Sequence, residues 1–449
     1  METKEAIKVK AKQSRIKLAS FMALAAFSVS AQTGSTNLSV KAGAEMRLRY
    51  DLTDNLPTAK RGESDYSSYA RVRLRPWIGA NYSDYGLFLR LADEFRYYNR
   101  PRSSSRKQRW PDVLFIDNLY LTAKDLPGSI DVKAGRQDMS FGARRIISDG
   151  VGGDGSRSAY FDAARLTWHA DDRRTLDAFA LYQAKEDWLP TLGKEHANGR
   201  KPQDYDITGY GQDEFGAGLY WQDRASKDFG YDAYYVAKGE RRGKDSKYRK
   251  EGRLTDTHTF GVRLLPRFTD TLSGEVELAG QVGSHDLVAG QGYAGLTYAP
   301  KAGFKPKLTG ACWILSGDSK GDRGEHAWHA VFNRETGLGE SIAPMYNKYD
   351  YTNLIYPHLA FGCNIASFSS IKTQVGPMFT AVREDDAGSF RGAYAQVKYT
   401  VSPAKLLGID LLHGGKLAFQ GEYFGKGDYF RDGSDHQAFF GRVELAWNF

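Results

Sequence analysis

The stretch that most constrains the fold is the last one, from Gln437 to Phe449. Apolar residues occupy every second position there, and polar residues such as Arg442 and Glu444 stand between them. A period of two is the pattern of a β-strand with one apolar and one polar face. We therefore expect the rest of the chain to be built from similar strands.

No apolar run outside the amino terminus is long enough to cross a bilayer as a helix. A strand that ends the chain on an aromatic residue resembles the closing strand and assembly signal of bacterial outer-membrane barrels, so the barrel-assembly machinery is an expected partner through Phe449. The predicted fold class is all-β, an antiparallel transmembrane β-barrel of about 18 strands with short periplasmic turns and long extracellular loops. The alternative is a large soluble all-β protein, whose apolar faces would meet in a packed core.

The amino terminus predicts the compartment. A basic segment with six Lys or Arg is followed by the apolar run 18–29 and by the small-residue sequence Val29-Ser30-Ala31. This order is typical of a signal peptide. We expect residues 1–31 to be cleaved and residues 32–449 to form a single barrel domain in the outer membrane of a Gram-negative-type bacterium. The signal segment also has two acidic residues, so its removal lowers the net charge from +8 to about +4.

The first mature strand indicates which face is wet. Met46, Leu48 and Tyr50 alternate with Arg47 and Arg49. An Arg that faces lipid at the middle of the bilayer costs about 2–4 kcal/mol. Both arginines are therefore expected to face the lumen.

The same alternation predicts strands along the whole chain. Their ranges are 41–52, 69–80, 85–97, 113–124, 129–138, 161–170, 175–186, 214–222, 230–238, 255–265, 271–283, 290–298, 305–316, 354–364, 370–382, 389–401, 415–425 and 436–449. Short connections such as 81–84 and 125–128 alternate with long ones such as 187–213 and 317–353, as a barrel with its amino terminus in the periplasm requires. Two strands, 290–298 and 354–364, fit the pattern less well, which leaves sixteen strands as an alternative.

Aromatic residues of the apolar face gather at the predicted periplasmic strand ends, where Trp and Tyr prefer the membrane interface. They are Trp168, Trp221, Tyr231, Tyr298, Tyr399 and Trp447. We expect them to form one girdle.

Several short stretches resemble the alginate export family. They are Asp117-Asn118-Leu119-Tyr120-Leu121, Leu126-Pro127-Gly128, the run from Lys133 to Gly142, Phe161-Asp162-Ala163-Ala164-Arg165-Leu166, Arg75-Pro76-Trp77 and the run from Trp313 to Asp318. The resemblance implies an eighteen-stranded outer-membrane pore that passes an anionic polysaccharide from the periplasm to the exterior. It also implies that Arg75 and Arg165 contact uronates.

Strand parity predicts a basic lumen. The candidate pore-lining residues are Arg47, Arg49, Arg71, Arg73, Arg75, Arg90, Lys133, Arg136, Arg165, Arg263 and Arg442. A guanidinium matches a carboxylate in bidentate fashion, and a ring of such groups concentrates anions. Inward acids such as Glu45, Glu94 and Asp177 leave open the alternative that these charges pair across strands and only solvate the bore. Arg136 has lipid-facing parity and needs a bulge near Gly135 to turn inward.

The favoured function is an anion-selective pore that exports a uronate-rich, alginate-like polysaccharide. The alternative is an uptake porin for anions, organic acids or oligosaccharides, and a non-conducting structural barrel or adhesin is a third class. No Ser, His and Asp set indicates an enzyme. Lipid, lipopolysaccharide and anionic solutes are the expected partners, whereas no cofactor or nucleic acid is expected. Asp318, Asp322 and Glu325 are weak candidates for a metal site.

Two connections are candidates for controlling the pore. The loop with Arg144 and Arg145 could fold inward as a constriction. The turn from Ser402 to Gly414 corresponds, by resemblance, to a periplasmic lid, but its leucines favour a packed turn.

Overall fold

The computed structural model describes residues 30–32, 38–55, 66–99, 113–148, 160–184, 187–193, 213–241, 254–319, 324–333, 352–383, 388–408, 414–430 and 437–449. Most of the predicted signal peptide, residues 1–29, lies outside these ranges. Residues 30–32 form a short strand, β1 (Ser30–Gln32), that pairs with residues 39–41.

Eighteen strands of the described residues form the wall of a closed antiparallel barrel. They are β2 (Leu38–Asp54), β3 (Ser67–Tyr82), β4 (Tyr85–Tyr98), β5 (Val113–Leu126), β6 (Ile130–Gln137), β8 (Phe161–Asp171), β9 (Arg174–Gln183), β11 (Asp213–Asp223), β12 (Phe229–Arg241), β13 (Leu254–Pro266), β14 (Leu272–Gly283), β15 (Leu287–Tyr298), β16 (Lys307–Leu315), β18 (Leu354–Ala366), β19 (Ser369–Phe379), β20 (Phe390–Val401), β21 (Lys416–Lys426) and β22 (Ala438–Asn448). Each predicted strand is present, including the two that fit the pattern less well. The count of eighteen is confirmed.

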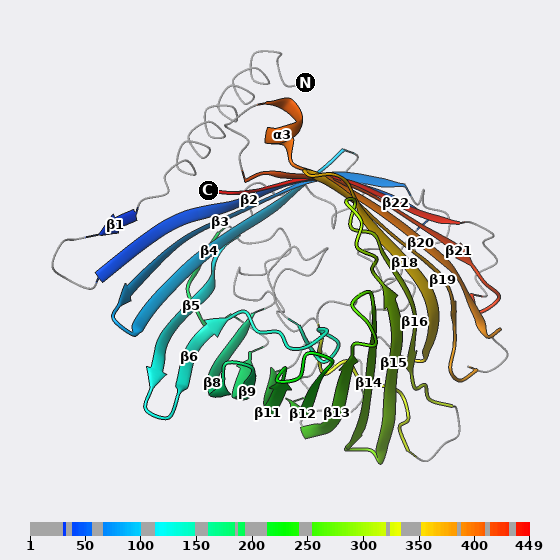
Figure 1. The fold of residues 1–449 in the computed structure, drawn as a ribbon, viewed down its shortest axis with the longest axis horizontal. Helices are drawn as coiled ribbons and strands as arrows, with labels where there is room; N and C mark the ends of the chain where they lie inside the picture. The colour runs from blue at the N-terminus through cyan, green and yellow to red at the C-terminus, as the bar shows by residue number, and fades with distance from the viewer. Residues whose placement is uncertain are drawn as a thin grey trace, which may run out of the picture.

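The barrel closes where the last strand meets the first. Strand β22 pairs with β2 from Asn448 opposite Glu45 to Phe439 opposite Asp54, and the two strands lie side by side in Figure 1. Closure is necessary because an open sheet edge in lipid would leave backbone N–H and C=O groups without partners. The terminal Phe449 adds backbone hydrogen bonds to Ala44 of β2, and its ring stacks on Trp447.

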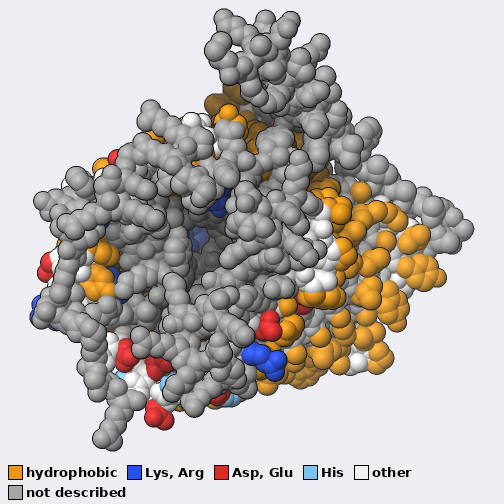
Figure 2. Space-filling view, turned by 180° about the vertical axis from the view of Figure 1, so that it is seen from behind, with side chains coloured by type: hydrophobic (Ala, Val, Ile, Leu, Met, Phe, Trp, Pro, Cys, Tyr) orange, Lys and Arg blue, Asp and Glu red, His pale blue; other side chains and the backbone are white. Residues whose placement is uncertain are grey.

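The wall is apolar outside and charged inside. On β2, Tyr50 and Leu52 are 36% and 38% exposed, whereas Arg49 and Asp51 are 3% and 0% exposed. Figure 2 shows the same arrangement, with hydrophobic side chains over the outer wall and Lys or Arg side chains deep in the hollow. This inverted pattern matches a lipid solvent outside and an aqueous lumen inside.

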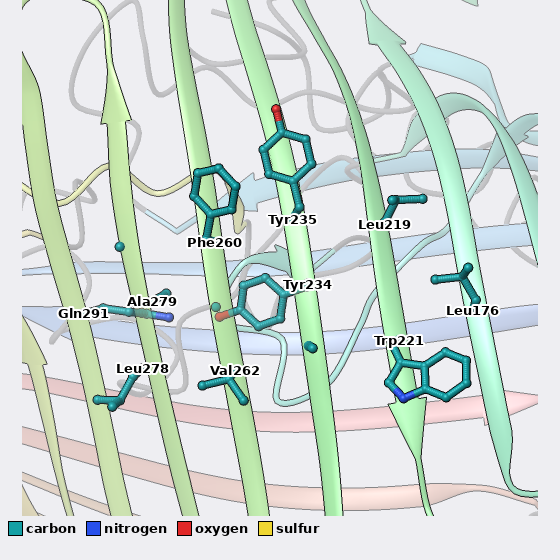
Figure 3. Close-up of a pocket in the computed structure, with 13 residues that line it drawn as sticks. Leu176, Leu219, Trp221, Tyr234, Tyr235, Phe260, Val262, Leu278, Ala279 and Gln291 are labelled. Atoms are coloured by element: carbon teal, nitrogen blue, oxygen red, sulfur yellow. The ribbon is translucent and has the colours of Figure 1, made fainter.

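The outer wall also contains a shallow depression of about 720 Å³. Figure 3 shows the outward side chains that border it on β11 to β14, among them Trp221, Tyr235, Phe260 and Leu278. Since this is the apolar face of the wall, membrane lipid is its natural neighbour. Near the strand ends, the ring centres of Trp221 and Trp168 are 6.5 Å apart, and Trp221 Nε1 donates to the Tyr231 hydroxyl. These contacts agree with the predicted girdle.

Two connections fold into the barrel and join there. The one after β6 carries β7 (Ile147–Ser148), and the one after β16 carries β17 (Phe332–Asn333); the two short strands pair in parallel. Phe141, Ile147 and Phe332 are buried in one cluster with side chains of the wall. We call the described residues 138–148 and 324–333 of these connections the inner loops. The expectation that the Arg144–Arg145 loop folds inward is confirmed.

A third small strand, β10 (Thr191–Gly193), pairs with β5 where β6 has left it. The turn after β20 forms a short helix, α3 (Pro403–Leu407), on which Leu406 and Leu407 are 53% and 59% exposed. The expectation of a packed turn is therefore wrong for these residues, and residues 409–413 lie outside the described part. No helix among the described residues is long and apolar enough to cross a membrane.

Candidate functional site: the charged lumen

Arginines gather on one side of the lumen, on β2, β3, β4 and β22. Seven predicted site residues, all 9% exposed or less, lie there; they are Arg47, Arg49, Arg71, Arg73, Arg75, Arg90 and Arg442. They come together because the alternation of each strand sends every second side chain inward and the barrel register sets neighbouring rows side by side. We call this set the basic cluster.

Carboxylates hold most of the basic cluster in place. Arg90 donates from Nε to Asp117 at 2.5 Å and from Nη2 to Asp138 at 2.7 Å, and Arg75 pairs with Glu45. Arg442 donates to Asp51 at 2.7 Å. Pairs with this little exposure are screened only weakly by salt, so they fix the guanidinium groups as a rigid wall.

Glu94 is shared by two arginines of the cluster. It lies 2.6 Å from Arg71 Nε and 3.4 Å from Arg47 Nη2. Its direct cross-strand neighbour is nevertheless Arg73.

Arg73 is left without a carboxylate among the described residues. Its side chain makes no ion pair there, its Nη1 is buried with no hydrogen-bond partner, and the residue is 9% exposed. It lies directly across from Arg47 and two residues from Arg71 and Arg75 on β3. A buried unpaired charge is unfavourable. An anion from the lumen would supply the missing partner.

The opposite wall holds its cations in ion pairs. Arg165 donates to Asp177 at 2.7 Å, and Arg263 donates to Glu275 at 2.9 Å. Arg145 of the inner loops lies 2.7 Å from Glu275 and 2.5 Å from Glu277. Burial alone would lower the pKa of Arg145, but the two glutamates outweigh burial and raise it, so the guanidinium stays charged.

Lys133 lies on β6, between the strands of the basic cluster and the strand that carries Arg165. Its Nζ lies 4.0 Å from the centre of the Tyr120 ring on the neighbouring strand, within the range of a cation–π contact. Lys133 is also directly opposite Arg165.

Arg136 does not join this set. The register continues unbroken through Gly135, so Arg136 stays on the outward face of Ala134, directly opposite Asp162. Asp162 and Asp187 bind its guanidinium at 2.8 and 2.9 Å, and Trp188, 64% exposed, donates to Asp162. The inward bulge that its assignment to the lumen required is absent, and the structure places Arg136 within the wall.

The metal candidates are not brought together. Glu325 binds His329 Nε2 at 2.8 Å, and Asp318 accepts from the backbone of His326 at 3.4 Å. No group of three ligating side chains occurs in the part of the chain that the structure describes, and Asp322 lies outside it.

Sequence reasoning missed Asp117 as a partner of the cluster. Arg90 pairs with Asn118 and Leu91 pairs with Ile116, so the register shifts between them and Asp117 has no residue opposite it on β4. This irregularity turns the Asp117 carboxylate to Arg75 and Arg90. A strict alternation of inward and outward residues does not predict an inward Asp117. The only signal was the place of Asp117 in a family-like motif.

A closed antiparallel barrel with an apolar outer wall and a charged lumen defines an outer-membrane pore. This chain belongs to the alginate export family, whose model, described as "Alginate export", matches residues 38–376. No curated protein matches the sequence.

Solved structures with a similar fold include three Occ proteins. OccAB1 of Acinetobacter baumannii is 10% identical with a TM-score of 0.61 and covers 91% of this chain and 96% of its own. OccK5 (OpdH) of Pseudomonas aeruginosa is 11% identical with a TM-score of 0.57, and the match covers 91% of this chain and 97% of OccK5. OccK11 (OpdR) of the same species is 12% identical with a TM-score of 0.56, over 91% and 95%. At these identities the likeness concerns the fold.

Proposed function

We propose that the pore is anion-selective and exports an anionic, uronate-rich polysaccharide. The observation that supports this most directly is the guanidinium of Arg73, which lies within the basic cluster and has no ion-pair partner in the described part of the chain. Carboxylates occupy its neighbours, so Arg73 is the position where a passing carboxylate gains a charge-assisted hydrogen bond. Family membership favours a polysaccharide as the passenger.

The pore-lining residues of this proposal are those that face the lumen. They are Arg47, Arg49, Arg71, Arg73, Arg75, Arg90, Lys133, Arg165, Arg263 and Arg442. The paired members give the wall its shape and field, and Arg73 offers a binding position of moderate strength. Conduction requires sites of this kind, because a passenger must also leave them.

Bilayer recording tests the proposal. In a KCl gradient the wild-type pore is expected to give the reversal potential of a channel more permeable to Cl⁻ than to K⁺, and oligouronates are expected to block it. Arg73→Gln should lower the Cl⁻/K⁺ permeability ratio and weaken the block by about ten- to hundredfold, since a hydrogen bond to a charged group contributes about 1.5–3 kcal/mol.

The matched control is Lys301→Gln, which removes one positive charge from an exposed turn, where Lys301 pairs with Asp270. It should leave the block unchanged. Cation selectivity of the wild type, or equal block of the wild type and Arg73→Gln, would contradict the proposal.

A pore for small anionic solutes is the second candidate. The observation that favours it is the folding of the inner loops into the barrel, which narrows the space for a polymer. The same recordings separate the two candidates. Block times that grow with oligouronate length support a polymer, whereas block that is equally strong with a single carboxylic acid supports the small solute.

We also infer that residues 1–31 are a cleaved signal peptide and that residues 32–449 form one barrel domain. The strand that ends at Phe449 would be the signal read by the barrel-assembly machinery. Deletion of Phe449 should lower the amount of folded barrel in the outer membrane, which heat-dependent gel mobility measures.

A further inference from the structure

Three aromatic side chains stack side by side on the lumen face of β3, β4 and β5. The centres of the Trp77 and Phe88 rings are 5.9 Å apart at an interplanar angle of 24°, and those of Phe88 and Tyr120 are 5.1 Å apart at 21°. All three are half-buried. We call them the aromatic track.

Two rings of the track rest on glycines of the preceding strand. A Cβ on Gly43 would lie 2.8 Å from the Trp77 ring, and one on Gly79 would lie 3.4 Å from the Phe88 ring. Because a glycine has no side chain, one face of each ring can lie against the backbone of the preceding strand. The other face of each ring is then on the side of the lumen.

A second group of aromatic side chains in the lumen is covered by one of the inner loops. Phe179, Tyr220 and Tyr234 are 5%, 3% and 6% exposed, and Phe141 of the inner loops stacks on the first two at 5.5 and 4.8 Å. These rings form the surface on which this inner loop packs. The rings of the aromatic track are less deeply buried, and the contact over one of them is that of the Lys133 ammonium, 4.0 Å from the centre of the Tyr120 ring.

Cations border the track. Trp77 is directly opposite Arg90 and two residues from Arg75, and Lys133 lies 4.0 Å from the Tyr120 ring. Flat apolar faces bordered by positive charge fit a ligand with an apolar ring face and an anionic edge. An acidic sugar has this form, since the C–H groups of its ring lie flat and its carboxylate projects outward. An open-chain carboxylic acid has no such face.

We propose that Trp77, Phe88 and Tyr120 form a stacking subsite for the pyranose rings of acidic oligosaccharides, on the short-turn side of the basic cluster. The inference rests on the proposed anion pore and adds a second mode of recognition to it. The track contacts the sugar rings, and the cluster contacts the carboxylates. Selection then depends on the ring as well as on the charge.

The test is the residence time of three blockers in single-channel recordings of the full barrel: an oligogalacturonate, its neutral methyl ester, and tricarballylate as an acid without a ring. Phe88→Leu keeps an apolar side chain but removes the flat face. It should shorten the block by both sugars about two- to tenfold and leave the reversal potential and the tricarballylate block unchanged. Trp77→Leu should act in the same direction.

Phe419→Leu is the matched control, because Phe419 is an outward aromatic that is 43% exposed. It should leave all three blocks unchanged. Heat-dependent gel mobility verifies that every variant is folded.

The proposal is contradicted if both sugars block Phe88→Leu and Trp77→Leu for as long as they block the control. It is also contradicted if the residence time of tricarballylate falls as much as that of the sugars. Failure of the anion pore has a different appearance. It would show as cation selectivity or as an Arg73→Gln pore blocked like the wild type, while the neutral ester still reports on the track.

Discussion

At the scale of single residues, pairing decides which arginines of the lumen are available to a solute. Arg73 and Arg90 have similar exposure, 9% and 7%, but opposite surroundings. Arg90 forms ion pairs with three carboxylates, whereas the acid directly opposite Arg73 binds Arg47 and Arg71. The two positions should therefore differ in stability as well as in binding.

Arg90→Met should lower the free energy of unfolding by about 3–5 kcal/mol, because it leaves Asp138 without its cation and removes the nearer of the two arginines that bind the buried Asp117. Arg73→Met should leave that free energy unchanged or raise it, since it removes a buried charge that has no ion-pair partner among the described residues. Urea unfolding in lipid vesicles measures both. Equal losses would show that Arg73 is stabilised by a contact of its own.

At the scale of elements, the junction between the last strand and the first has little spare room. A Cβ on Gly43 would lie 2.5 Å from the backbone oxygen of Phe449 and 2.8 Å from the Trp77 ring. Gly43→Ala should lower the free energy of unfolding by about 1–3 kcal/mol through overpacking and reduce the yield of folded barrel. Gly303→Ala is the control, since a Cβ there meets no atom within 4 Å. Equal yields of the two variants would contradict the tight junction.

The inner loops are a second test at this scale. Arg145 joins them to Glu275 and Glu277 of β14, and its guanidinium lies 3.6 Å from the centre of the Tyr293 ring. Arg145→Gln removes the charge that makes these contacts, so the loops should leave their seat more often. Single-channel conductance should rise and become noisier, while Lys301→Gln should not differ from the wild type. An Arg145→Gln pore with unchanged conductance would show that packing alone holds the loops.

At the scale of the whole molecule, selectivity by charge has a dependence on salt that selectivity by size lacks. The Debye length falls from about 10 Å at 0.1 M to about 3 Å at 1 M ionic strength. The Cl⁻/K⁺ permeability ratio should therefore fall as KCl rises over this range. A ratio that does not change with salt would indicate that the inner loops sort ions by size.

The sequence by itself determined the wall of this protein. Alternation with a period of two predicted eighteen strands, and the bounds of β2 and β22 differ by a few residues from the predicted 41–52 and 436–449. The strength of this signal has a physical cause, because every strand must satisfy lipid on one side and water on the other. The same constraint indicated that Arg47 and Arg49 face the lumen.

Only the tertiary structure decided which charges meet. The pairing of Arg90 with Asp117 depends on a register irregularity, and the position of Arg136 depends on the absence of one. The folding of β7 and β17 into one sheet joins residues far apart in the chain, as Ser148 and Asn333 show with a 2.9 Å hydrogen bond. Parity assigns a side chain to a face of the wall, but a partner across the lumen is set by the closure of the barrel. Arg73 shows the same at a single position, because Glu94 binds Arg71 and Arg47 and not Arg73, its direct cross-strand neighbour.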